Sequence, residues 1–329
     1  MFESNEPGSI DAAPPSPALD CVHCADCIEL LPAYPEHFFS VCVTDPPYNY
    51  EIAGHAWDEA EIARRVGRVQ ESSTLVKHMP YGSGLAGGVR NARWYERNRA
   101  NVLAYAAWCE SWGRAVFRVL RPGGFLLVFN SNRTVAQVQV AMESSGFYPR
   151  DLLVWRRHAG IPRGYNHANA LRRRAPDEAA AWQGWQSCFM NGWEAVLLLQ
   201  KPLHNNYAQT LAESGVGLLQ VQDEDGAFRS NILEGFKKSP EERTLDHLTV
   251  KPLSLVRHLL ECTLPPGGGH IVLDPFAGSG TTCVAARELG HRFVGVERES
   301  KHCELARKRL EEKKGNRGSG EVDGFAGRV

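Results

Sequence analysis

The stretch Ile271-Val272-Leu273-Asp274-Pro275-Phe276-Ala277-Gly278-Ser279-Gly280-Thr281-Thr282 predicts an apolar strand, a glycine-containing turn and the start of a helix. Glycines let a backbone pass close to a ligand, and a helix N-terminus offers free N–H groups. The turn lacks the lysine of a phosphate-binding loop and the third glycine of a dinucleotide-binding fingerprint. It therefore favours a zwitterionic cofactor, whose ammonium group would meet Asp274 and whose carboxylate would meet the amides of the turn.

The chain before and after this stretch repeats the alternation of strand and helix. Seven short apolar runs predict strands, at 20–24, 40–44, 124–130, 152–156, 193–200, 270–274 and 292–297. Helical periodicity appears at 27–34, 102–120, 134–145, 252–263, 281–289 and 301–313. Arg121-Pro122-Gly123-Gly124 predicts a turn that ends one helix and starts the next strand. Strands that alternate with helices indicate an α/β fold, with a seven-stranded, mostly parallel sheet covered on both faces.

The strand that follows the glycine turn, at 292–297, ends in Glu297. An acid at the tip of the second strand of such a unit is well placed to accept hydrogen bonds from two ribose hydroxyls. The alternative is a solvated carboxylate that caps the helix after it. The glycine turn just before this strand favours the ribose contact.

A second motif, Thr44-Asp45-Pro46-Pro47-Tyr48-Asn49, follows the strand at 40–44. Two adjacent prolines stiffen the chain and hold the preceding Asp45 in an extended conformation. Asp45 and the Pro46 carbonyl can each accept one N–H bond from an aromatic amine, which frees the nitrogen lone pair for an incoming methyl group. Tyr48 can stack on a base that has left the duplex. We therefore predict Asp45, Pro46, Pro47 and Tyr48 as catalytic residues; the alternative is a plain Asp-Pro turn at a strand end.

These two motifs resemble those of the DNA amino-methyltransferases, which carry an Asp/Asn/Ser-Pro-Pro-Tyr catalytic motif and a Phe-x-Gly-x-Gly motif for S-adenosylmethionine. The catalytic motif comes first here, a circularly permuted order that resembles the β group of the family. The resemblance covers roughly residues 20 to 312 and implies a Rossmann-like methyltransferase sheet. Segments such as 161–164 and 193–196 resemble the solitary adenine methylases of phages and prophages.

The resemblance also implies further cofactor contacts. Ala25-Asp26-Cys27 matches the family segment whose Asp contacts the cofactor adenine. The segment 247–252 matches His-Pro-Thr-x-Lys-Pro, except that Leu248 replaces the first Pro, and this places Thr249 and Lys251 near the methionine carboxylate. An ordinary lysine at a helix start is the alternative for Lys251. The cofactor-binding residues expected in all are Asp26, Thr249, Lys251, Asp274, Phe276, Ala277, Gly278, Ser279, Gly280, Thr281, Thr282 and Glu297.

The residue before Pro-Pro bears on the target base. Asp at this position resembles the adenine-N6 enzymes, so we predict methyl transfer from S-adenosylmethionine to the N6 amine of a flipped adenine in double-stranded DNA. Cytosine N4 is the alternative, because it offers the same two N–H groups and many cytosine enzymes have Ser there. A DNA-binding relic without turnover and an enzyme that acts on RNA are further alternatives.

Two stretches that are too long for ordinary connections leave the predicted sheet at strand ends. Residues 46–101 are expected to form a catalytic loop that closes over the flipped base. Residues 157–192 are expected to be a target-recognition insertion, since seven arginines against one acid lie between residues 150 and 174. Arg163, Arg172, Arg173 and Arg174 are expected to bind DNA, the last three at phosphates. The alternative is a solvated basic loop.

These features divide the 329-residue chain into a disordered leader at 1–18, a catalytic half at 19–156, the insertion, a second half at 193–312 and a flexible tail at 313–329. The net charge of −1 gives no general support for nucleic-acid binding. Cys21, Cys24 and Cys27 lack a second pair at zinc-finger spacing, so we expect reduced thiols and no metal. No apolar run has the roughly 20 residues of a membrane span, and no export signal is evident. We expect a cytoplasmic protein, as a monomer or a homodimer.

Overall fold

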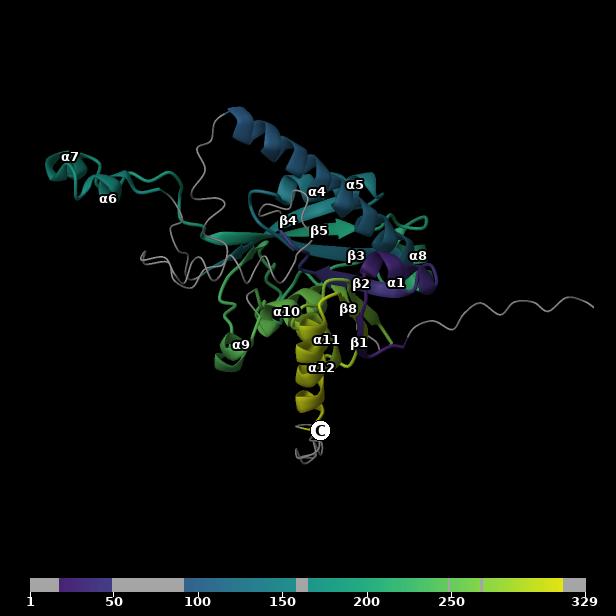
Figure 1. The fold of residues 1–329 in the computed structure, drawn as a ribbon. Coiled ribbons are helices and arrows are strands. Elements are labelled where there is room, and N and C mark those ends of the chain that lie inside the picture. The colour runs from purple at the N-terminus through teal and green to yellow at the C-terminus, as the bar shows by residue number, and fades with distance from the viewer. Residues whose placement is uncertain (1–17, 49–91, 158–164, 248, 267–268, 316–329) are drawn as a thin grey trace, which may run out of the picture.

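The computed structural model describes residues 18–48, 92–157, 165–247, 249–266 and 269–315. These residues form an eight-stranded sheet in the order β1-β8-β7-β2-β3-β5-β4-β6 (Figure 1). The strands are β1 (Cys21–Cys24), β2 (Phe39–Thr44), β3 (Leu120–Asn130), β4 (Tyr148–Arg156), β5 (Trp193–Gln200), β6 (Ile232–Leu233), β7 (Ile271–Asp274) and β8 (Arg292–Glu297). All seven predicted strands are confirmed. The eighth, β6, has only two residues and is too short to show any periodicity.

Neighbouring strands are parallel except around β5, which is antiparallel to both β3 and β4. The mostly parallel α/β sheet expected from the sequence is therefore confirmed. Every residue of β2 and β7 is buried, as in the central strands of a parallel sheet with both faces covered. Because β5 runs the opposite way, its amino end lies at the same edge as the carboxyl ends of β2, β3, β4, β7 and β8.

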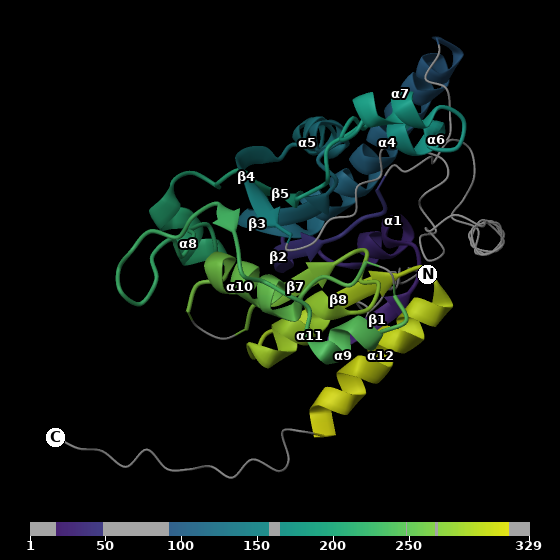
Figure 2. The same ribbon diagram turned by 90° about the vertical axis from the view of Figure 1, so that its left-hand side faces the viewer.

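Helices cover both faces of the sheet (Figure 2). One face carries α1 (Cys27–Leu30), the short 3-10 helix η1 (Leu31–Ala33), α4 (Ala92–Val119) and α5 (Val135–Ser144), and the other carries α10 (Leu253–Thr263), α11 (Thr281–Glu288) and α12 (Ser300–Gly315). Alternate residues of β2 supply the two cores. Cys42 belongs to the same buried cluster as Trp112 of α4, whereas Val41 and Val43 belong to the cluster of α10 and α11.

Several boundaries differ from the sequence predictions; for example, β4 begins at Tyr148 rather than at 152. Helix α4 begins at Ala92, whereas the sequence predicted a start at 102. The prediction missed residues 92–101 because they are rich in Arg and Asn and show little apolar periodicity. The expected catalytic loop of 46–101 therefore ends inside a helix. The turn expected at Arg121–Gly124 lies within β3, where the register jumps from Phe39 opposite Leu120 to Val41 opposite Phe125. Helix α12 continues to Gly315, past the expected start of the tail at 313.

Four short helices complete the part of the chain that the structure describes: α6 (His167–Leu171), α7 (Pro176–Ala181), α8 (Tyr207–Ser214) and α9 (Pro240–Thr244). Helices α6 and α7 belong to the 157–192 insertion and stand away from the sheet, beyond the ends of β4 and β5 (Figure 1). The Arg157 N–H donates to the Gly192 carbonyl at 2.8 Å and closes the base of the insertion. Among the helices described, none is long and apolar enough to cross a membrane.

Candidate active site

The diproline motif and the glycine turn, more than 200 residues apart in sequence, meet at one edge of the sheet. Strands β2 and β7 are neighbours, and each of the two motifs follows the carboxyl end of one of them. The Thr44 hydroxyl donates to Asp274 Oδ1 at 2.8 Å, and the Thr282 hydroxyl donates to the Val43 carbonyl at 3.4 Å. Asp45 therefore lies next to the predicted cofactor turn, as methyl transfer between two bound molecules requires.

Asp274 is a buried carboxylate without a cation beside it in the described chain. Its Oδ1 accepts hydrogen bonds from the Thr44 hydroxyl and from the Phe276 N–H, the latter at 3.1 Å. Burial raises its pKa to about 7, although these bonds and the Thr282 hydroxyl oppose the rise. A carboxylate in this condition is suited to an incoming ammonium group, which would replace the solvation that burial removes.

The two glycines of the turn have conformations and surroundings that exclude larger residues. Gly278 has φ +48°, and a Cβ there would lie 2.9 Å from the imidazole Nε2 of His247. Gly280, the residue before α11, has φ +76°, and a Cβ there would lie 2.8 Å from the Cβ of Ala306. The backbone can follow this path only without side chains, which fits a turn that passes close to a ligand.

Other residues of the turn have structural partners. Phe276 packs against Trp108 and Trp112 of α4, with ring centroids 5.5 and 5.4 Å apart. The buried Arg309 of α12 donates to the Ser279 hydroxyl at 3.2 Å and to the Thr281 hydroxyl at 3.1 Å. These side chains shape the turn. Arg309 was not expected from the sequence, where it is one of many charged residues in the last helix.

Further expected cofactor residues, Ala277 and Thr282, are buried in the same turn. Glu297 accepts the Gly278 N–H on Oε2 at 2.8 Å and the Glu299 N–H on Oε1 at 2.9 Å. The second bond is the helix-capping role weighed as an alternative above, and the first ties the carboxylate to the glycine turn. Asp26 caps α1 by accepting the Ile28 N–H at 2.8 Å. It lies close to Glu297, because the preceding Ala25 N–H donates to the Glu297 carbonyl at 3.0 Å.

Asp45 and Pro46 follow β2 directly, and two tyrosine hydroxyls hold the residues after them. Tyr105 of α4 donates from its hydroxyl to the Pro47 carbonyl at 3.1 Å and fixes the diproline corner. Tyr105 is in turn held by the side chain of Asn130 at the end of β3, at 3.1 Å. The Tyr48 hydroxyl donates to Glu194 Oε2 at 3.4 Å. The motif is therefore anchored from both sides as far as Tyr48, and residues 49–91 lie outside the described chain.

The Asp45 carboxylate is 20% exposed, and its two oxygens differ. Oδ2 forms an ion pair with the Lys251 ammonium group. Oδ1 is buried and has no hydrogen-bond partner within the described residues. Burial raises the pKa of Asp45, and the Lys251 charge opposes this rise. One acceptor oxygen is thus held in place and a second remains available to a donor.

Lys251 therefore lies at the Asp45 carboxylate, and its expected contact with the methionine carboxylate of the cofactor stays a prediction. Its ammonium group is also 3.6 Å from Glu194 Oε2 and 5.2 Å from the centre of the Phe129 ring. Burial disfavours its charge, but Asp45 and Glu194 outweigh burial and raise its pKa. Thr249 donates from its N–H to His247 Nδ1 at 3.3 Å, and His247 packs against Gly278. Glu194 was missed, although an acid inside an apolar strand is a visible signal.

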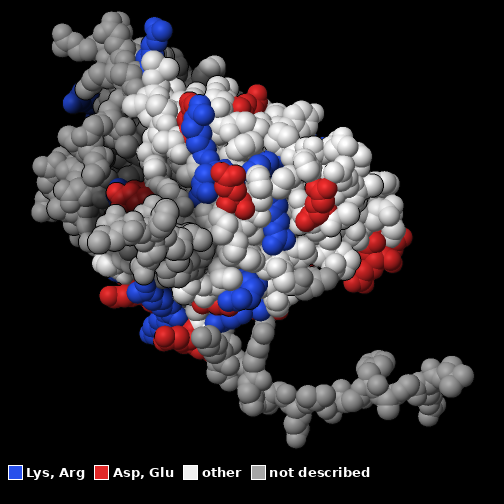
Figure 3. Space-filling view, turned by 90° about the vertical axis from the view of Figure 1, so that its right-hand side faces the viewer, with Lys and Arg blue, Asp and Glu red and all other residues white. Residues whose placement is uncertain are grey.

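The residues expected to bind DNA lie in the insertion, apart from the site. Arg172, Arg173 and Arg174 are exposed in the turn between α6 and α7, and Arg163 lies outside the described residues. Behind them is a row of ring contacts: Tyr165 with His167, His167 with Trp182, and Trp182 with Trp185. The face on the other side of the molecule shows basic and acidic residues side by side (Figure 3).

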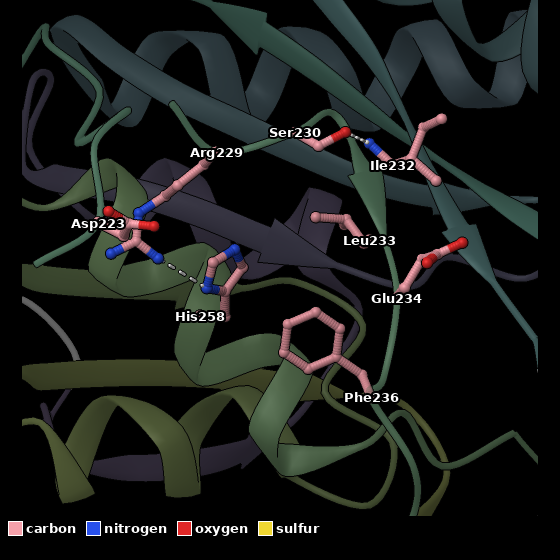
Figure 4. Close-up of a pocket in the computed structure, with 8 residues that line it drawn as sticks. All are labelled: Asp223, Arg229, Ser230, Ile232, Leu233, Glu234, Phe236 and His258. Carbon is pink, nitrogen blue, oxygen red and sulfur yellow. Dashed lines mark hydrogen bonds between the residues drawn. The ribbon is translucent and has the colours of Figure 1, made fainter. Parts of the chain in front are cut away.

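A cavity of about 500 Å³ opens beside β6, at the far end of the sheet from β1 (Figure 4). Arg229 and His258 lie on one side of it, with 3.4 Å between the guanidinium Nη1 and the imidazole Nδ1, and Leu233 and Phe236 line the other. None of the predicted site residues lines this cavity. The geometry at the edge formed by β2, β7 and β8 is therefore the better candidate for the active site.

Comparison with known proteins identifies the family of the chain. The sequence profile of a DNA methylase family matches residues 39–308. Type II methyltransferase M.HindIII of Haemophilus influenzae is 30% identical over 314 residues, which is 91% of this chain and 97% of the relative. The M1.HpyAVI–SAM complex has a TM-score of 0.51 at 18% identity and covers 88% of this chain and 98% of its own. The cytosine-N4-specific PvuII DNA methyltransferase has a TM-score of 0.52 at 14% identity and covers 91% and 93%.

Proposed function

Because this chain belongs to the DNA methylase family, we propose that it methylates the exocyclic N6 amine of an adenine that has been flipped out of double-stranded DNA. The observation that carries the proposal is the Asp45 carboxylate, which has one oxygen held by Lys251 and the other buried without a partner in the described part of the chain. An amine N–H placed at that oxygen would satisfy it, and leaving it unsatisfied in the bound state would be costly.

S-adenosylmethionine is the cofactor, and when bound it supplies an electrophilic methyl group on a sulfonium centre. The residues present fit it. Asp274 would accept its ammonium group, which explains a buried carboxylate whose pKa is raised to about 7. Gly278 and Gly280 would let the backbone approach it, since neither position has room for a Cβ. Glu297 and Asp26, at neighbouring strand ends, would contact the ribose and the adenine.

The chemistry left to the chain is to orient the amine and to release its lone pair. The nitrogen of adenine N6 is a poor nucleophile because its lone pair is delocalised into the ring. Asp45 Oδ1 and the Pro46 carbonyl would each accept one N–H bond and so draw the nitrogen toward a tetrahedral shape. The ring of Tyr48, tethered through its hydroxyl to Glu194, would stack on the base. Such catalysis depends on positioning and preorganised acceptors more than on a strong base.

Cytosine N4 is the second candidate, because that amine presents the same two N–H groups to the same acceptors. The Asp at position 45 favours adenine through its resemblance to the adenine enzymes. The solved PvuII enzyme is cytosine-N4-specific, but at 14% identity it informs on the fold alone. The likeness to M.HindIII, a type II methyltransferase, supports a DNA modification enzyme of that type. The insertion, with Arg172, Arg173 and Arg174, would contact DNA at phosphates.

The test is incubation of the pure protein with labelled S-adenosylmethionine and unmodified DNA, followed by digestion to nucleosides and mass spectrometry. We expect N6-methyladenine; N4-methylcytosine would favour the second candidate, and no labelled nucleoside would refute both. Asp45→Ala should reduce methyl transfer at least about 100-fold and leave cofactor affinity within about threefold. Asp151→Ala, which removes an exposed carboxylate on β4, is the matched control and should retain activity.

A further inference from the structure

A chain of alternating charges runs from the catalytic carboxylate to the base of the insertion. Lys251 binds Asp45 and lies 3.6 Å from Glu194 Oε2, and Arg157 Nη1 lies 2.9 Å from Glu194 Oε1. Lys251 and Glu194 are 8% and 12% exposed, whereas Arg157 is 39% exposed. The four side chains come from four separate segments, next to β2, β4, β5 and α10. Such an arrangement needs a reason, because burying charges is costly unless each one has a partner.

Lys251 determines which way the Asp45 carboxylate faces. A carboxylate that follows a rigid diproline corner can still rotate about its own side-chain bonds. The ammonium group on Oδ2 removes that freedom and leaves Oδ1 as the free acceptor. The ring centres of Phe129 and Tyr48 lie 5.2 and 5.5 Å from the ammonium nitrogen, so two aromatic rings surround part of it. The interaction therefore fixes the oxygen that the target amine would meet.

Glu194 connects this pair to two other parts of the site. Its Oε2 accepts the Tyr48 hydroxyl at 3.4 Å and faces Lys251. The Tyr48 ring, which would stack on the base, and the Asp45 carboxylate, which would bind its amine, are therefore both positioned through Glu194. Its Oε1 accepts from Arg157, whose own N–H closes the base of the insertion on the Gly192 carbonyl. Arg157 thereby links the insertion to Glu194.

We propose that Lys251 and Glu194 are positioning residues that orient the Asp45 carboxylate and the Tyr48 ring for methyl transfer, and that Arg157 joins them to the target-recognition insertion. The proposal rests on the proposed function. It differs from the role that the family resemblance gives Lys251, which is to hold the methionine carboxylate of the cofactor. The two roles predict different effects when Lys251 is replaced: a positioning role lowers kcat, whereas a cofactor-binding role raises the Kd for S-adenosylmethionine.

The first measurement separates binding from turnover in Lys251→Met, which keeps the length of the side chain and removes its charge. If Lys251 positions Asp45, kcat should fall at least about 100-fold while the Kd for S-adenosylmethionine, from calorimetry, stays within about threefold. If it holds the cofactor, Kd should rise at least about tenfold, and that result would overturn the proposal. Retained cofactor binding also shows that the variant is folded.

The second measurement is the pH profile of kcat/KM for variants of Lys251 and Glu194. If both residues were merely structural, the two variants would not shift the acid limb of this profile in opposite directions. The charged or titratable groups around Asp45 are Lys251, Glu194 and Tyr48, together with Asp274 and Tyr105, whose pKa values its charge raises. Losing the Lys251 charge should move the acid limb to higher pH, because the cation favours the ionised Asp45. Losing the Glu194 charge in Glu194→Gln should lower kcat about tenfold or more and move the limb to lower pH. Shifts in the same direction, or none, would refute the positioning roles.

Matched controls are available one strand away. Glu234 and Arg156 form an ion pair at 2.7 Å that touches none of the site residues, so Glu234→Gln and Arg156→Met should retain kcat. Arg157→Met should lower kcat about threefold to tenfold with little change in DNA affinity, because Arg157 would act by holding Glu194 to the insertion and not by binding DNA. Equal losses in Arg156→Met and Arg157→Met would contradict the link. A wild-type protein without methyl transfer would instead refute the proposed function, so the two failures are distinguishable.

Discussion

Replacing Asp274 with Asn should make the cofactor-free protein more stable and at the same time unable to bind its cofactor tightly. Asn keeps the size of the side chain and the oxygen that accepts from the Thr44 hydroxyl and the Phe276 N–H. It removes only the negative charge. Because Asp274 is buried and its charge has no cation next to it among the described residues, that charge opposes folding until the ammonium group of a ligand arrives.

The size of the effect follows from the pKa of Asp274, about 7 in the folded protein. The pKa of an unfolded Asp is about 3.9, so between these two values the folded state binds more protons than the unfolded state. The free energy of unfolding of the wild type must then fall as the pH rises from about 4 to about 7, by about 1.4 kcal/mol per pH unit. The sum is about 4 kcal/mol, an upper estimate for the gain of the Asn variant at pH 8.

The assay is urea unfolding of both proteins at pH 5 and pH 8, followed by calorimetry with S-adenosylmethionine. The stability difference should be larger at pH 8 than at pH 5. Cofactor affinity of the wild type should fall about tenfold per pH unit below pH 7, since protonated Asp274 cannot bind an ammonium group. The Asn variant should bind about 100-fold more weakly at pH 8, the loss of one buried charged contact. An Asn variant that is less stable at pH 8, or that binds the cofactor as well as the wild type, would refute the reasoning.

Three further predictions concern the turn, the insertion and the core. Gly278→Ala should weaken cofactor binding at least about tenfold in calorimetry, because its Cβ would lie 2.9 Å from His247; a second change, His247→Ala, should restore part of the affinity. Changing Arg172, Arg173 and Arg174 together to Gln should reduce the slope of log K against log salt for DNA binding by about 0.9 for each phosphate that these side chains neutralise; an unchanged slope would remove them from the interface. Lys201→Met should cost about 2 kcal/mol in urea unfolding, because the buried ammonium group donates to the Leu120 carbonyl at 2.8 Å, and it should leave activity per folded molecule intact.

The central elements of the fold could be predicted because the secondary structure that their sequence pattern favours is also the one that their tertiary surroundings require. Strands such as β2 and β7 are covered on both faces, so they appear in the sequence as largely apolar runs of strand length. The turn after β7 could be predicted because glycines at 278 and 280 are required by backbone conformation. In each case burial or backbone conformation restricts which residue types can occupy the position, so the sequence itself carries the signal.

Other elements depend on contacts that spacing does not reveal. The two residues of β6 form a strand only because they pair with Val154 and Trp155 of β4. Helices α6 and α7 have five and six residues, too few to form alone, and the ring contacts around Trp182 support them. No local signal marks such segments, so the sequence showed a long insertion and not its internal structure.

In the site, the separate halves were predictable and the connections between them were not. The diproline motif and the glycine turn each carry a local chemical pattern. The ion pair between Asp45 and Lys251 joins residues that are 206 positions apart, and the bond between Tyr105 and Pro47 depends on where α4 packs. The resemblance predicts Lys251 near the cofactor, and the geometry adds that its ammonium group binds the Asp45 carboxylate.

The reversed direction of β5 explains how the acid at its start comes to the site. Parallel strands contribute to this edge through their carboxyl ends, so an antiparallel strand contributes through its amino end. β5 has eight residues and extends about 26 Å at a rise of about 3.3 Å per residue. If it ran parallel to β3, Glu194 would lie at the opposite edge, and Lys251 would retain Asp45 alone as an acidic partner among those described. The reversal of this strand is therefore a condition for the charge chain between Asp45 and the insertion, because it brings a buried acid beside the carboxyl ends of β2 and β4.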